Sequence, residues 1–173
     1  MPRDIAGPVR PGHTVEKIGG TSMSRLLELA ETLIVGDRAG PDLYDRVFVV
    51  SAFGGVTDML LEHKKSGDAG VYAHFADGET DAEWSDALTN VGARMCEINA
   101  EMLGDSGELR FADDFVRERI EGARSCLIDL KRLASYGHFR LSRQMLIVRE
   151  LLAGLGEAHS AFVATLLLSR MGV

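Results

Sequence analysis

The stretch VEKIGGTSMS, residues 15–24, decides how this chain begins to fold. The alternating segment HTVEKI (residues 13–18) ends in a Gly-Gly pair, which is typical of a β-strand that runs into a tight turn. The following residues, SRLLELAETLIVG (24–36), carry apolar side chains at the spacing of an amphipathic helix, and Gly36 is a suitable end for it. We therefore predict a strand over residues 13–18, a glycine turn and then a helix.

A second stretch, VFVVSAFGGVTD (residues 47–58), repeats this order. The segment RVFVVSAF (46–53) is short and almost wholly apolar, as expected for a strand buried on both faces of a parallel sheet. Another Gly-Gly pair and the helix-like segment VTDMLLEHKK (56–65) follow. Two successive strand–turn–helix units predict an α/β fold, layered α/β/α around a mainly parallel sheet.

The rest of the chain is predicted to be helical. Two long periodic segments span residues 81–103 and 112–137, and glycines end both of them. Residues 141–173 predict two further helices with a break near residues 154–156. The chain ends where the next strand of a βα pattern would begin, so we expect an incomplete sheet whose open edge favours a homo-oligomer.

Composition restricts the function. The 173 residues carry a net charge of −7, which argues against a nucleic-acid partner. We expect a cytoplasmic protein without a membrane segment, because we find no run of about 18 apolar residues and no signal sequence. Residues 1–12 hold three of the four prolines and predict a flexible N-terminal extension. Cys96 and Cys126 lie far apart without metal-ligand spacing, so we expect two reduced thiols and assign no metal ligand.

The two glycine turns are candidate phosphate-binding loops. Each follows a predicted parallel strand, and ligands of open α/β sheets bind at these carboxyl ends. Glycines allow the backbone to approach phosphate oxygens, and a lysine adds a positive charge. The residues concerned are Lys17, Gly19, Gly20, Thr21 and Ser22 in the first loop, and Ser51, Gly54, Gly55 and Thr57 in the second.

These loops match neither common nucleotide-binding motif. In the Walker motif the lysine follows the glycines, whereas Lys17 precedes them, and the chain has no G-x-G-x-x-G run. The alternative for each loop is a tight turn beside a solvated lysine. Two such turns after two successive strands favour the phosphate-binding interpretation.

The segment GLGEAHSA (154–161) is a third candidate element. Glu157 is expected near the start of a helix, where a carboxylate either stabilises the first turn or binds the ammonium group of an amino acid. For His159, as for the other histidines, we expect a structural role without catalytic function.

The three segments together resemble the aspartokinases. VEKIGGTSMS resembles the family's K-[FI]-G-G-T-S signature, VVSAFGGVTDMLLE resembles V-V-S-A-x-x-G-[VI]-T-[ND]-x-L, and GLGEAHSA resembles S-x-G-E-x-x-S-A. One position departs from the pattern, since Gly154 stands in place of the first serine of the third motif. The residues within these motifs are most similar to those of aspartokinases found with ectoine biosynthesis.

The resemblance implies that residues 13–173 are the N-terminal portion of an amino-acid kinase domain that phosphorylates L-aspartate with ATP and Mg²⁺. It implies that Lys17 is the catalytic cation, that the two glycine pairs with Thr21 and Ser22 hold the ATP phosphates, and that Ser51, Thr57 and Glu157 bind aspartate. Two alternatives stay open: a related kinase acting on glutamate, acetylglutamate, carbamate or a nucleoside monophosphate, or an inactive truncated chain that only binds or oligomerises.

Overall fold

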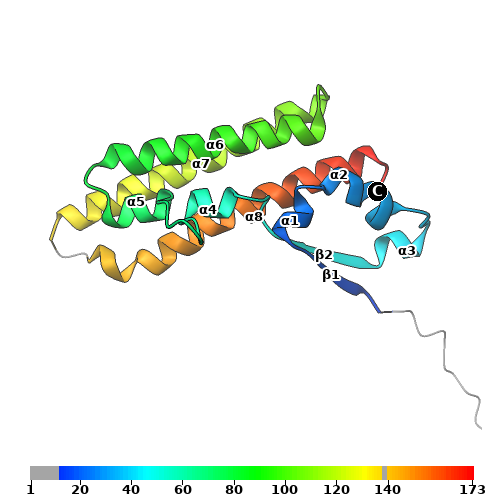
Figure 1. Ribbon diagram of the computed structural model, residues 1–173, viewed down its shortest axis with the longest axis horizontal. Helices are drawn as coiled ribbons and strands as arrows, with labels where there is room; N and C mark the ends of the chain where they lie inside the picture. The colour runs from blue at the N-terminus through cyan, green and yellow to red at the C-terminus, as the bar shows by residue number, and fades with distance from the viewer. Residues whose placement is uncertain (1–11, 138–139) are drawn as a thin grey trace, which may run out of the picture.

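The computed structural model describes residues 12–137 and 140–173, so the predicted extension lies, apart from Gly12, outside the described residues. The described part is a helix-rich α/β unit with a small parallel sheet (Figure 1). Its elements are β1 Thr14–Ile18, α1 Gly20–Met23, α2 Leu26–Leu29, the π-helical η1 Ala30–Val35, α3 Pro41–Tyr44, β2 Arg46–Val50, α4 Val56–Leu60, α5 Val71–Asp77, α6 Asp81–Leu103, α7 Gly107–Ser135, the 3₁₀ turn η2 Leu141–Arg143 and α8 Met145–Arg170.

The two strands pair in parallel, as predicted. Their register runs from Thr14 opposite Arg46 to Ile18 opposite Val50, so both carboxyl ends lie at the same edge. The helical segment between them is interrupted: it comprises α1, α2 and η1 and ends at Gly36, whose φ is +51°. The predicted second strand is shortened, because residues 51–53 leave the sheet and form a loop.

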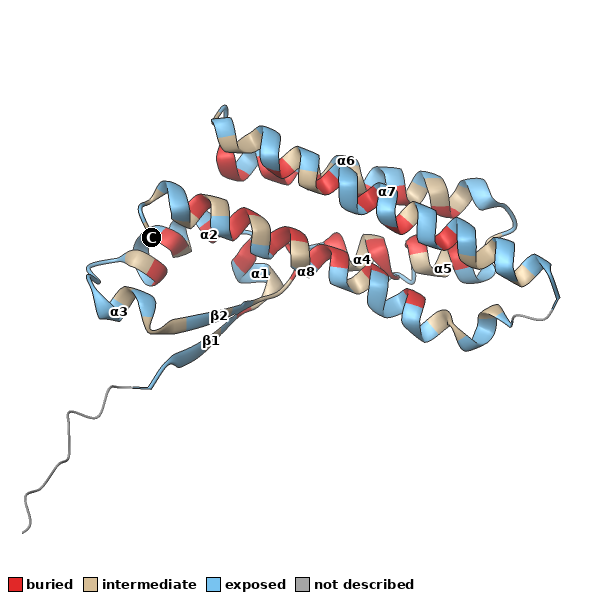
Figure 2. Ribbon diagram, turned by 180° about the vertical axis from the view of Figure 1, so that it is seen from behind, coloured by how far each residue is buried: buried red, intermediate tan, exposed pale blue. Residues whose placement is uncertain are grey.

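The two faces of the sheet differ. On one face, Arg46 is almost buried and donates two hydrogen bonds of 2.7 Å to the Glu16 carboxylate and one of 2.7 Å to the Ile34 carbonyl. The opposite face exposes Val15, Val47 and Val49, each by 46% or more. In the two strands, only the carboxyl end of β1 is drawn as buried (Figure 2). The prediction of a strand buried on both faces is therefore wrong for β2, because nothing in the described part of the chain covers this side.

The long helices form a bundle beside the sheet. α6 and α7 make an antiparallel hairpin, and α8 extends from this hairpin to the sheet, where it contacts β2 (Figure 1). The three helices contact one another, and α6 and α8 also contact α4 and α5. Buried positions recur along all three of them (Figure 2). α6 and α7 thus pack on other helices. The expected α/β/α layering is seen in part, as the contact between α8 and β2 and the hydrogen bond from Arg46 to η1.

α8 is continuous through residues 154–156, so the predicted break is wrong. A glycine costs a helix interior about 1 kcal/mol relative to alanine, which is why Gly154 and Gly156 suggested a break. Packing overrides this cost at Gly156, where an added Cβ would lie 2.8 Å from the Ala52 Cβ and 3.2 Å from Val56 Cγ1. The absence of a side chain lets the helix approach the loop that follows β2.

α8 is also the one helix in residues 12–137 and 140–173 that is long and apolar enough to cross a membrane by length and composition, with a mean hydropathy of 1.6 over 18 residues. The helix contains Arg149, Glu150, Glu157 and His159, so it is not an uninterrupted run of apolar residues. Its position accounts for its composition, because Val148, Leu152, Val163 and Leu167 are buried between the hairpin, α4 and the sheet.

Both cysteines are free, as expected. Cys96 is half-buried on α6, and burial raises the pKa of its thiol to about 11. Cys126 is exposed on α7. At neutral pH Cys96 is therefore a protonated, weakly reactive thiol.

The two glycines of α8 generate a paired prediction. Gly156→Ala is expected to destabilise the chain by about 1–3 kcal/mol, because its methyl group would push α8 away from Ala52. Gly154→Ala is expected to stabilise it by about 0.5–1 kcal/mol, because Gly154 is exposed and nothing lies within 4 Å of an added Cβ. Urea unfolding of both variants measures the difference, and equal stabilisation by both would contradict the close contact at Gly156.

Candidate functional site

The two glycine loops touch each other at the carboxyl edge of the sheet. An added Cβ at Gly20 would lie 2.9 Å from the Ala52 carbonyl oxygen, and one at Gly54 would lie 2.9 Å from Ser24 Oγ. The Ser51 N–H donates to the Ile18 carbonyl at 2.9 Å, which fixes the second loop beside the first. Any side chain at Gly20 would force the loops apart, so both motifs contribute to one site.

The first loop presents unpaired backbone donors. The N–H groups of Gly20, Thr21 and Ser22 begin α1, and no acceptor for them occurs among the described residues. The side chains of Thr21 and Ser22 are exposed beside them. Successive unpaired N–H groups at a turn are suited to binding an anion.

Lys17 lies two residues before this loop, on the exposed face of β1 opposite Val49. It forms no ion pair within residues 12–137 and 140–173, so its ammonium group is available to a ligand. In the second loop Gly55 has a φ of +83° and precedes Thr57, which is half-buried in the first turn of α4. The sequence-predicted residues of both loops therefore lie at one edge of the sheet.

The third motif reaches this edge from α8. The Ser160 hydroxyl donates to the Ser51 carbonyl at 2.8 Å, and the His159 ring packs against the Phe53 ring with centroids 5.4 Å apart. Together with the Gly156 contact, these interactions hold one turn of α8 against residues 51–53. The Glu157 side chain is exposed on this turn. The expectation that Glu157 starts a helix is wrong, because it lies in the middle of α8.

A buried polar chain extends from this turn into the bundle. Asn99 on α6 donates from Nδ2 to Asp113 Oδ1 on α7 at 2.9 Å, and its Oδ1 lies 2.7 Å from His159 Nε2. Because Asn99 Oδ1 can only accept, His159 donates from Nε2. Its Nδ1 is left as a buried acceptor with no partner in the described part of the chain. Burial lowers the pKa of His159 to about 4, so the ring is neutral at physiological pH.

The sequence does not predict these hydrogen bonds between Asp113, Asn99 and His159. It predicts a structural role for His159 and gives no role to Asn99. A signal was present, because Asn99 falls on the apolar stripe of α6, four residues after Met95 and three before Met102. A polar side chain at such a position is usually hydrogen-bonded. The sequence could not identify its partners on two other helices.

A pocket opens beside the second glycine loop. It has a volume of about 370 Å³, within the range of small-molecule sites. It is lined by Gly54, Gly55, Asp58, Met59, His63, Asp68, Ala69 and Arg94. Arg94 donates to Glu97 and Glu101 at 2.9 Å each, so its charge is already compensated.

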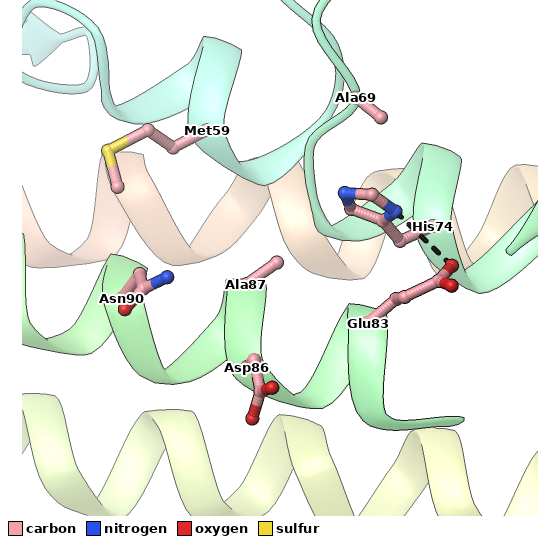
Figure 3. Close-up of a pocket in the computed structure, with 7 residues that line it drawn as sticks. All are labelled: Met59, Ala69, His74, Glu83, Asp86, Ala87 and Asn90. Carbon is pink, nitrogen blue, oxygen red and sulfur yellow. Dashed lines mark ion pairs between the residues drawn. The ribbon is translucent and has the colours of Figure 1, made fainter. Parts of the chain in front are cut away.

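A separate pocket lies between α4, α5 and α6 and contains none of the predicted site residues (Figure 3). Its lining residues are Met59, Ala69, His74, Glu83, Asp86, Ala87 and Asn90. His74 and Glu83 form an ion pair of 3.7 Å across it. Its polar groups are compatible with a solvated groove between helices.

The buried histidine predicts a pH dependence of stability. The folded pKa of about 4 is below the ordinary value of 6.5, so the unfolded chain binds more protons between these values. The stabilisation is complete above about pH 6.5 and is lost as the pH falls towards 4. We expect wild type to lose about 2 kcal/mol of unfolding free energy between about pH 7.5 and about pH 5 through this group.

His159→Gln removes the titrating group and should remove this part of the pH dependence in urea unfolding. His13→Gln, at an exposed histidine outside the helical bundle, is the control for the loss of an imidazole as such. A His159→Gln variant with the same pH dependence as wild type would contradict the burial of a neutral imidazole.

Comparison with known proteins agrees with the motifs. No protein-family model and no solved structure matches the chain. It is 51% identical over 161 residues to aspartate kinase Ask_Ect of Stutzerimonas stutzeri (strain A1501), and the match covers 93% of this chain. The chain spans 34% of the length of that relative. The resemblance to the aspartokinases is thereby confirmed, and the chain is homologous to about a third of such a kinase.

Proposed function

We propose that this chain is the N-terminal portion of an aspartate kinase, which transfers the γ-phosphoryl group of ATP to the β-carboxylate of L-aspartate. The observation that carries the proposal is the contact between two glycine loops at the ends of parallel strands, joined there by the α8 turn that bears Glu157. Identity to a named aspartate kinase supports the substrate assignment. The relative's name and the motif wording support the type found with ectoine biosynthesis.

The first loop is assigned to the ATP phosphates. Its unpaired N–H groups at Gly20, Thr21 and Ser22 supply donors, Gly19 leads into the turn, and Lys17 supplies a charge. Gly54 and Gly55 of the second loop complete this side of the site.

The aspartate side is assigned to Ser51, Thr57 and Glu157. Support comes from the exposed Glu157 carboxylate on the turn of α8 that contacts Ser51, and from the pocket beside Gly54 and Gly55. A carboxylate placed there can pair with the ammonium group of an amino acid, while hydroxyls hydrogen-bond its carboxylates.

The chemistry requires no strong base. The acceptor β-carboxylate is ionised at neutral pH and is itself the nucleophile. Acceleration then comes from positioning and from neutralising the charge on the moving phosphoryl group, by Lys17 and backbone N–H groups. Mg²⁺ enters with ATP as part of the substrate. The described residues contain no group of three or more His, Cys, Asp or Glu side chains suited to a metal, and we assign none.

The wider assignments follow from the same proposal. Residues 13–173 form part of an amino-acid kinase domain with a layered α/β/α fold, in a cytoplasmic enzyme whose partners are ATP and L-aspartate. The exposed side chains of Val15, Val47 and Val49 support a homo-oligomer or a further covering layer on the sheet.

The proposal is tested by assaying the complete enzyme with MgATP and a panel of acceptors: aspartate, glutamate, N-acetylglutamate, carbamate and nucleoside monophosphates. ADP release and trapping of the acyl phosphate with hydroxylamine should be specific for aspartate. Turnover of another acceptor in its place would overturn the substrate assignment.

Lys17→Ala is expected to lower kcat of the complete enzyme by about 10²–10³-fold, because this charge acts on the transferring phosphoryl group. Lys64→Ala, in the exposed loop after α4, is the matched control and should stay within about twofold of wild type. Steady-state kinetics check both, and a Lys17→Ala enzyme with near-normal kcat would exclude Lys17 from the phosphate site.

Glu157→Gln is expected to raise KM for aspartate by at least about tenfold, because an ammonium ion left without its charged partner costs about 2–4 kcal/mol. KM for ATP should stay nearly constant. Glu150→Gln, also exposed on α8, provides the control. A parallel rise in both KM values would show a distorted site and would count against Glu157 as an aspartate ligand.

A further inference from the structure

The hydrogen bonds that link Asp113, Asn99 and His159 lie in the core between the helices. Asp113, Asn99 and His159 come from three different helices and are linked by hydrogen bonds of 2.9 and 2.7 Å. Asn99 is fully buried and His159 is 1% exposed. A hydrophobic trio of the same volume would pack these helices without the cost of burying polar groups.

The order of the donors fixes the orientation of the imidazole. The Asp113 carboxylate accepts from Asn99 Nδ2, which turns Asn99 Oδ1 towards His159 and makes Nε2 the protonated nitrogen. A histidine held in one tautomer and one orientation by such a relay is a common device at functional sites.

The far side of the imidazole meets the candidate site. Its ring packs on Phe53, which lies between Ala52 and Gly54 in the second glycine loop. The neighbouring residues on α8 are Ser160, which holds the Ser51 carbonyl, and Gly156, which contacts Ala52. The position of residues 51–54 therefore depends on where the His159 ring is held.

We propose that His159 is a positioning residue for the amino-acid side of the site, held by Asn99 and Asp113, and that it sets the second glycine loop through Phe53. The inference rests on the proposed function. Within the described residues, neither Asn99 nor Asp113 forms a hydrogen bond with either glycine loop, whereas His159 is bonded to Asn99 and packs on Phe53 of the second loop, so His159 is the direct link between them.

Asn99→Leu in the complete enzyme is the principal test. It keeps the side-chain volume and removes the partner of His159, and it should raise KM for the acceptor by about five- to twentyfold while KM for ATP stays within about twofold. Leu127→Ala truncates a fully buried side chain on α7 and is the control for lost stability. It should lower the melting temperature and leave both KM values unchanged.

Asp113 gives a conservative comparison. Asp113→Asn keeps an acceptor oxygen for Asn99 and should behave like wild type, whereas Asp113→Leu removes it and should reproduce the rise in acceptor KM. A merely structural role would lower stability in both leucine variants without separating the two KM values. Unchanged acceptor KM in Asn99→Leu, or an equal rise in Leu127→Ala, would overturn the proposal.

A measurement on the wild-type chain covers the case in which the variants do not fold. Nitrogen NMR of the imidazoles should find His159 protonated at Nε2 and bare at Nδ1, and the opposite tautomer would overturn the proposed relay. Failure of the proposed function and failure of the His159 proposal give different results. A wild-type enzyme that phosphorylates no aspartate refutes the proposed function. An active enzyme whose acceptor KM is insensitive to Asn99→Leu refutes only the role of His159.

Discussion

The approach of Gly20 to the Ala52 carbonyl is the constraint on which the site depends. Parallel pairing of β1 and β2 brings the two carboxyl ends to one edge, but only a residue without a side chain allows the loops to touch there. Among the described residues, the N–H groups that begin the first loop have no backbone acceptor. The contact that forbids a side chain at Gly20 therefore lies beside unpaired donors, which is the arrangement on which the proposed phosphate site rests.

α8 supplies the second half of this arrangement. Its Gly156 lies against Ala52 in the loop after β2. On the same side of α8, the Ser160 hydroxyl bonds the Ser51 carbonyl and the His159 ring packs on Phe53. Glu157 is exposed on the same turn of α8. If it binds aspartate as proposed, the rigid helix gives it a more precise position than a loop would.

The parts of the fold that are determined locally were predicted from the sequence. Strand alternation, the Gly-Gly pairs and the long apolar periodicities identified β1, β2, α6 and α7, and three motifs identified the kinase resemblance. The continuity of α8 was not predictable, because local propensity at Gly154 and Gly156 favours a break and only the contact with Ala52 reverses it.

The exposure of Val47 and Val49 could not be predicted for a related reason, since an apolar strand does not reveal whether both of its faces are covered. The partnership of Asn99 and His159 joins residues 60 positions apart on separate helices, and no periodicity encodes it. The motifs themselves were therefore recognisable in the sequence, whereas the residues on other helices that contact them were not.

The bond from Ser160 to the Ser51 carbonyl has a consequence for how the molecule is made. The two residues are 109 positions apart, while β1 and β2 pair over a much shorter separation. During synthesis β1 and β2 emerge first, and they can pair because they are close in the sequence. The loop after β2 cannot make its contact with α8 until α8 has left the ribosome. The contact between the glycine loops and α8 consequently cannot form before α8 has been synthesised, and the nascent chain passes through a stage in which the glycine loops exist without this helix.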